Sequence, residues 1–117
     1  MNKKREVWIT GIGVVSSLGI GIDPTWEALR RGEINVDRKL HSLWINHPIA
    51  PFDLDAQIPK RGDQRQMEIW QRIGTYADGL ALDTAGLKGD RDVLAKTDMI
   101  VAAGGGERDL SVDESVP

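Results

Sequence analysis

The hydrophobic positions of this chain form two apolar runs with two amphipathic segments between them. Residues 7–22 are rich in β-branched side chains and carry closely spaced glycines, and residues 99–103 form a short apolar run before three glycines. The first run predicts a buried strand followed by a tight turn, and the second predicts a strand covered on both faces. The order is therefore strand, helix, loop, helix, strand, which favours an α/β fold with a parallel pair of strands.

The first amphipathic segment predicts a short helix over residues 23–32. Asp23 is a suitable N-cap, and Pro24 fits the first helical position, where its missing N–H costs nothing. Trp26 and Leu29, three residues apart, would give the helix a buried side. Gly32 is expected to end it.

The second amphipathic segment predicts one long helix over residues 63–85. Asp63 and Gln66 resemble a capping box at its start, and Gly86 would end it. A stripe of apolar residues recurs every three or four positions along it: Met67, Trp70, Ile73, Gly74, Ala77, Ala81 and Ala85. Gly74 and Gly79 cost stability inside a helix, so we expect a close-packed neighbour beside them.

Composition limits the function classes. A chain of 117 residues forms one domain at most, and 40% hydrophobic with 28% charged residues is ordinary for a globular protein. The absence of cysteine excludes disulfides, cysteine metal sites and thiol nucleophiles within the chain. The uncharged residues 7–22 are too few and too rich in glycine to span a membrane, and no cleavage site of a secretory signal follows the basic start. We therefore expect a cytoplasmic protein without a membrane span.

The net charge of −3 is located at the C-terminal end. Residues 107–117 hold four acidic residues and one basic residue, so the remainder of the chain is balanced. Nucleic acid is not expected as a partner, because its recognition requires a basic face. The acidic end is interpreted as a solvated tail.

Two glycine-rich stretches do not complete a nucleotide-binding motif. Gly11 and Gly13 supply the first two glycines of a dinucleotide fingerprint, but Ser16 stands where the third belongs. The glycines at 104–106 are not followed by the Lys-Ser/Thr of a phosphate loop, and the acidic Glu107 and Asp109 would repel an anion. No cofactor is expected.

The two histidines do not form a metal motif. His41 and His47 are six residues apart, which matches no common ligand spacing, and no cysteine accompanies them. We expect ordinary surface histidines, with no metal and no catalytic role.

Three motifs in the same order resemble the β-ketoacyl-acyl-carrier-protein synthases of the thiolase fold. The chain reads TGIGVVSSLG at residues 10–19 with WEAL at 26–29, then RQMEIW at 65–70, then DTAGL at 83–87. The glycines at 104–106 stand where that family has a glycine-rich turn. The resemblance covers about residues 7–110 and is weakest between residues 35 and 51.

The resemblance implies a partial thiolase-like fold that needs the rest of a synthase, or a partner, to complete its layers. Residues 1–110 would be the N-terminal part of the synthase N-terminal domain, and residues 111–117 an acidic tail or truncated connection. The implied activity is decarboxylating condensation of an acyl thioester with malonyl-acyl-carrier protein, in fatty-acid or polyketide elongation. The family's catalytic cysteine and two histidines have no counterpart here, so the chain alone is expected to be an inactive piece of this acyltransferase.

Two other interpretations remain. Where the family turn continues with Gly-Gly, this chain has Gly106 and Glu107, which leaves room for a non-catalytic partner subunit of the chain-length-factor kind or a carrier-binding module. The other interpretation is a self-standing nucleotide-binding α/β domain. The incomplete glycine fingerprint argues against it.

The resemblance also implies partners. Synthases of this kind dock their acidic acyl carrier protein through basic residues around the start of the long helix, where this chain has Lys60, Arg61 and Arg65. Arg61 and Arg65 are four residues apart and would share a helix face. The alternative is three solvated surface cations. A homodimer, or a heterodimer with another synthase subunit, is expected.

Overall fold

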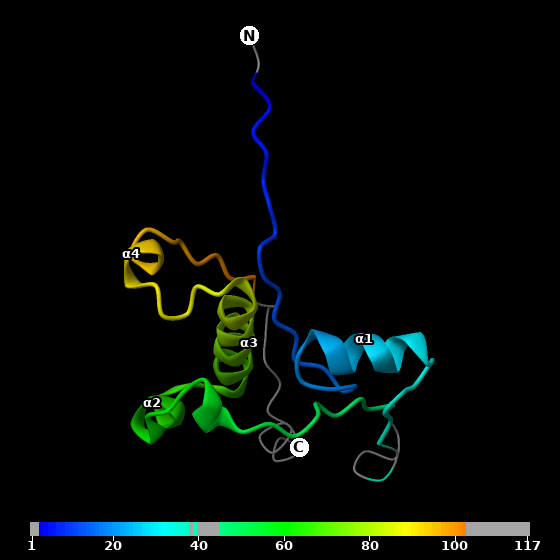
Figure 1. Cartoon of the computed structure of the whole chain (residues 1–117). Coiled ribbons are helices and arrows are strands. Elements are labelled where there is room, and N and C mark those ends of the chain that lie inside the picture. The colour runs from blue at the N-terminus through cyan, green and yellow to red at the C-terminus, as the bar shows by residue number, and fades with distance from the viewer. Residues whose placement is uncertain (1–2, 38, 40–44, 103–117) are drawn as a thin grey trace.

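The computed structural model describes residues 3–37, 39 and 45–102, and its regular elements are helical. They are the helices α1 (Ile22–Arg30), α2 (Arg61–Gln66), α3 (Ile69–Ala85) and α4 (Arg91–Leu94), with one 3₁₀ turn, η1 (Leu54–Ala56). Figure 1 shows α3 at the centre, α2 near its N-terminal end and α4 near its C-terminal end. The opening segment passes between α3 and α1.

Two glycines bring the opening segment into backbone contact with α3. A Cβ atom at Gly13 would overlap the carbonyl oxygen of Ala77 and lie 2.7 Å from the amide nitrogen of Ala81. A Cβ at Gly11 would overlap the carbonyl oxygen of Ala81 and lie 2.8 Å from the Cβ of Ala85. Such a close approach is possible only for residues without a side chain. The small residues of the predicted α3 stripe therefore face the opening segment.

A side-chain hydroxyl on α3 also contacts this segment. Thr84 Oγ1 lies 3.2 Å from the carbonyl oxygen of Ile12 and 2.7 Å from that of Leu80 in its own helix. The contact fixes how the opening segment sits along α3.

The predicted tight turn is confirmed over residues 14–21. Val15 and Ile20 form an antiparallel bridge, and Gly21 N–H donates to the carbonyl of Val14 at 2.8 Å. Ser16 Oγ accepts from the N–H of Leu18 at 3.2 Å. The turn thereby satisfies its own backbone groups.

The turn leads directly into α1, whose start differs from the prediction. The helix begins at Ile22 after Gly21, whose φ of 93° carries the chain out of the turn. Asp23 is therefore in the first helical turn and is not the N-cap, although its charge still suits the helix dipole there. Gly32 ends the segment as predicted, with a φ of 70°.

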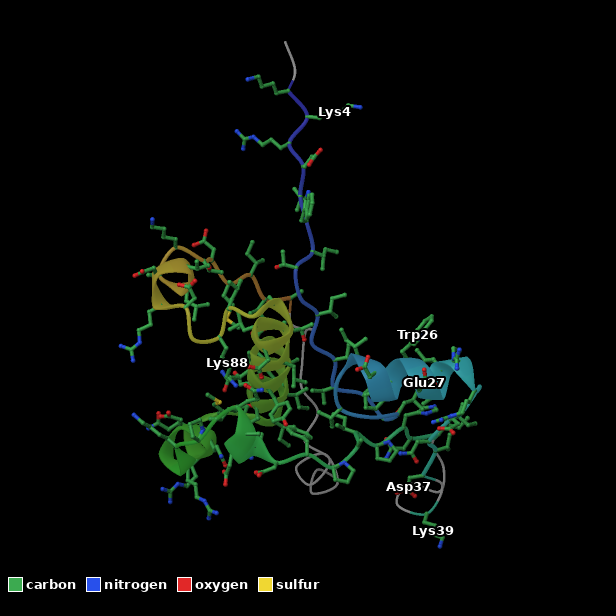
Figure 2. The ribbon with its side chains drawn as sticks, viewed as in Figure 1. Lys4, Trp26, Glu27, Asp37, Lys39 and Lys88 are labelled. Carbon is green, nitrogen blue, oxygen red and sulfur yellow. The ribbon has the colours of Figure 1, made fainter. Side chains whose placement is uncertain are left out.

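The buried side predicted for the first helix is wrong for the described residues. Trp26 is 60% exposed and Leu29 is 57% exposed, whereas Ala28 between them is buried. Figure 2 shows Trp26 directed outward from α1.

The predicted long helix is two helices. The chain between α2 and α3 is extended at Met67, with φ −93° and ψ 140°. Glu68 then starts α3, and its N–H donates to Gln71 Oε1 at 2.8 Å in a capping box. That box replaces the one predicted at residues 63 and 66. The carbonyl of Gln64 accepts from the N–H of Met67 at 3.2 Å and also from Arg72 Nε at 2.9 Å, so a side chain of α3 is bonded to the end of α2.

The C-terminal end of α3 is confirmed. Gly86 has a φ of 73°, and Leu87 N–H donates to the carbonyl of Leu82 at 2.9 Å in a Schellman ending. The close neighbour expected at Gly79 is present, because the side chain of Gln57 lies against it. Among the residues that the structure describes, none outside the local helix backbone lies within 4 Å of a Cβ placed at Gly74, so the neighbour expected there is not found.

The start of the first apolar run and the described residues of the second are exposed, not buried as predicted, whereas residues 13–22 of the first run are half-buried. Val7, Trp8 and Ile9 are 78–89% exposed on a segment that projects from the body (Figure 1), and Ile100 is 95% exposed. The predicted partial thiolase-like fold, which requires further polypeptide to cover these runs, stays a prediction. Residues 103–117, with the glycine turn and the acidic tail, lie outside the described residues. No helix in the described ranges has the length and hydropathy needed to cross a bilayer.

The packing predicts opposite outcomes for two glycine substitutions. Gly13→Ala should destabilise the protein by about 1–3 kcal/mol, because its methyl group collides with the backbone of α3. Gly74→Ala, in open space inside the same helix, should stabilise it by about 0.5–1 kcal/mol. Urea unfolding followed by circular dichroism measures both free energies, and equal effects of the two substitutions would contradict the packing.

Candidate functional site

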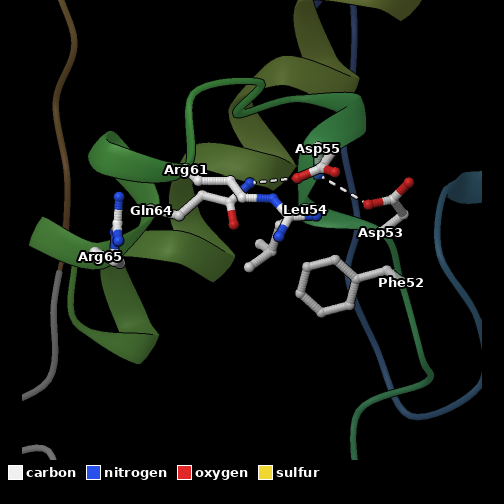
Figure 3. Close-up of a pocket in the computed structure, with 7 residues that line it drawn as sticks. All are labelled: Phe52, Asp53, Leu54, Asp55, Arg61, Gln64 and Arg65. Atoms are coloured by element: carbon white, nitrogen blue, oxygen red, sulfur yellow. Dashed lines mark hydrogen bonds between the residues drawn. The ribbon is translucent and has the colours of Figure 1, made fainter.

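An open pocket lies between η1 and the first turns of α2. Its volume is about 500 Å³. The lining residues are Phe52, Asp53, Leu54, Asp55, Arg61, Gln64 and Arg65. Figure 3 shows Phe52 and Asp53 at one end and Arg65 at the other, with Leu54, Arg61 and Gln64 between them.

Short-range hydrogen bonds build the η1 side of the pocket. Asp53 Oδ1 accepts from the N–H of Asp55 at 3.0 Å and so caps the turn. The carbonyl of Leu54 accepts from the N–H of Ile58 at 2.8 Å, and Ile58 is buried. The turn is thereby tied to the small core of the described residues.

One glutamine joins the two sides. Gln64 Nε2 lies 2.7 Å from Asp55 Oδ1 and 2.7 Å from the carbonyl oxygen of Ile58, and it donates to both. These bonds fix α2 against η1, so the pocket is present before any ligand arrives.

An aromatic pair connects the pocket to α3. The ring of Phe52 packs on Tyr76, with centroids 4.7 Å apart and an interplanar angle of 59°. Tyr76 is the buried residue of α3. Phe52 is half-buried, with part of its ring on the pocket wall.

Two of the three cations predicted to dock a carrier protein, Arg61 and Arg65, line this pocket, and Lys60 lies just before them in the chain. Lys60 precedes α2, Arg61 is its first residue and Arg65 lies in its last turn, so both arginines are helical, as the predicted common face requires. All three are exposed, and none forms an ion pair with a carboxylate of the described residues. The site also holds two carboxylates, Asp53 and Asp55, which the sequence did not single out.

The described histidine has a structural contact. His47 is exposed, and its Nδ1 lies 2.9 Å from the carbonyl oxygen of Asn35 across a loop. His41 lies outside the described residues. Within the described ranges, no group of three or more His, Asp or Glu side chains could hold a metal ion.

A polar cluster holds the segment after η1 against the end of α3. Gln57 Nε2 donates to Asp83 Oδ2 at 2.8 Å, Lys88 Nζ lies 3.4 Å from the same oxygen, and Lys88 also contacts Gln57 Oε1. Figure 2 shows Lys88 beside α3. The hydrogen bond from Gln57, aided by the charge of Lys88, holds the pKa of Asp83 below its ordinary value, against a smaller opposing effect of desolvation.

Comparison with known proteins gives a distant relationship to synthases. No family model and no solved structure matches the chain. It is 28% identical over 113 residues to the 3-oxoacyl-[acyl-carrier-protein] synthase 2 of Vibrio harveyi, and 26% identical over 113 residues to that of Vibrio cholerae. Each alignment covers 92% of this chain and 27% of the relative, so the chain spans about a quarter of the relatives' length. The synthase-like resemblance read from the motifs is supported at this coarse level.

The polar cluster of Gln57, Asp83 and Lys88 predicts a lowered pKa for the Asp83 carboxyl. Asp83 should titrate below the ordinary Asp range, and Gln57→Leu and Lys88→Met should each raise its pKa. Because the folded pKa is lowered, the stabilisation is present above the unfolded pKa and is lost as pH falls through the folded pKa. The carboxyl carbon shift of Asp83, followed by NMR against pH, measures this. An Asp83 pKa that stays the same in Gln57→Leu would contradict the assignment.

Proposed function

We propose that this chain is the N-terminal part of a β-ketoacyl synthase of fatty-acid or polyketide elongation, and that its α2 region docks an acidic acyl carrier protein. The observation that carries the docking is the group of exposed cations just before and within α2, Lys60, Arg61 and Arg65, which have no ion pair with a described carboxylate. The alignment with two carrier-protein-dependent synthases over 92% of the chain supports the same function.

The proposed reaction is the decarboxylating condensation of an acyl thioester with malonyl-acyl-carrier protein. Such chemistry needs a thiolate nucleophile and groups that stabilise the developing oxyanion. This chain contains no cysteine, and His47 is directed to a loop carbonyl. Catalysis would therefore reside in the rest of a longer synthase, or in a companion subunit, within a dimer in the cytoplasm.

A non-catalytic partner subunit is the second candidate. The charged residues 107–109 after the glycine turn, where the family has small or apolar residues, favour it. The intact mass of the protein purified from its natural source separates two cases. A mass near 12.9 kDa means a separate subunit, whereas a mass several times larger means one piece of a longer enzyme.

Electrostatics explains why the α2 cations suit docking. Exposed charges at the rim of an interface mainly raise the association rate of an oppositely charged partner and fix its orientation. Each exposed ion pair contributes about 0.2–1 kcal/mol, and salt weakens it. Three cations close together thus fit a transient acidic partner that must bind and leave in each cycle.

Reversing one of these charges tests the docking. Arg65→Glu should weaken the binding of acyl carrier protein about three- to tenfold at low salt, because an attraction becomes a repulsion. Arg91→Glu on α4 makes the same change in net charge far from α2 along the chain and should leave the affinity unchanged. Isothermal titration calorimetry with the Vibrio harveyi carrier protein measures both.

Two results would contradict the docking. The first is an Arg65→Glu affinity equal to wild type in low salt. The second is an equal loss in Arg65→Glu and Arg91→Glu, which would mean that net charge alone attracts the partner.

A further inference from the structure

The pocket between η1 and α2 has apolar as well as charged lining residues. Between η1 and α2 the pocket has an apolar wall formed by Leu54 and Phe52, both half-buried, and its volume of about 500 Å³ lies in the range of ligand-binding pockets. Rim cations alone would not require a hollow at this place. The apolar wall therefore offers a contact besides charge at this place.

We propose that this pocket receives an apolar side chain of the docked acidic protein, while Arg61 and Arg65 pair with carboxylates that flank it. This inference rests on the proposed docking function. It adds an apolar anchor to it, which is the partner side chain held in the pocket. The apolar wall supplies the contact that stabilises the complex, and the cations supply attraction and orientation. The occupant is thus an amphipathic acidic segment with one large apolar residue beside its acidic residues.

The layout of charge gives the occupant a direction. Figure 3 places Asp53 at the opposite end of the pocket from Arg65, and Asp55 belongs to the η1 turn. Asp53 accepts the N–H of Asp55, and Asp55 accepts the side-chain amide of Gln64. They would repel acidic residues from the η1 side, so the acids of the partner must lie over α2. Repulsion at one end and attraction at the other specify one orientation.

Contacts within the protein fix the geometry of the pocket. Gln64 bonds η1 and α2 together, and Phe52 packs on the buried Tyr76 of α3. A preformed pocket reduces the ordering cost of binding, which suits a partner of moderate affinity.

The test separates the anchor from the charges. Leu54→Ala truncates one of the two apolar side chains of the pocket wall and should weaken binding of the Vibrio harveyi acyl carrier protein about three- to tenfold, with the salt dependence unchanged. The heat-capacity change of binding should become less negative, because less apolar surface is buried. Leu29→Ala, an exposed leucine on α1, is the matched control and should change neither quantity.

A second variant keeps the test valid if Leu54→Ala does not fold. Leu54→Trp fills the pocket instead of emptying it, and should also weaken binding, while its circular dichroism spectrum stays that of the wild type. If Arg65→Glu weakens binding but both Leu54 variants bind as the wild type does, the anchor is wrong and the docking stands. If none of the three changes affinity, the docking and the anchor are both wrong.

Discussion

The close approach of the opening segment to α3 is the constraint on which the other described contacts depend. Gly11 and Gly13 let the backbone of the segment touch the backbone of the helix at its alanines, where any side chain would collide. The contact places the turn of residues 14–21 and, through it, α1. Few large side chains are buried among the described residues. This backbone contact therefore holds the elements together, as a hydrophobic core does in larger domains.

The opposite side of the same helix supports the candidate site. Tyr76 receives the ring of Phe52, and the last turn of α3 holds Gln57 through Asp83. These contacts position η1, and Gln64 then positions α2 against it. The proposed docking surface is thus a consequence of how α3 is packed, although it lies on a different helix.

Local features could be predicted from the sequence, and tertiary ones could not. Gly32 and Gly86 end their helices as expected, because a left-handed residue after an amphipathic segment is a local signal. The break before Glu68 was missed, since the apolar stripe runs through it and two capping boxes compete. The pocket was missed because it depends on Gln64 reaching Asp55, nine residues away. The apolar residues at 7–9 and 99–101 were predicted to be buried strands but are exposed. Their sequence shows that they are hydrophobic, but it does not show which polypeptide would cover them.

The central claim is that α2 and η1 together form the docking surface for an acidic carrier protein. An NMR titration of the ¹⁵N-labelled protein with acyl carrier protein tests it most directly, because amide shifts locate the contact residue by residue. The account predicts that the perturbed amides cluster between residues 52 and 66 and that added salt reverses their shifts. Perturbations centred on the exposed face of α1 around Trp26, or none at any residue, would contradict it.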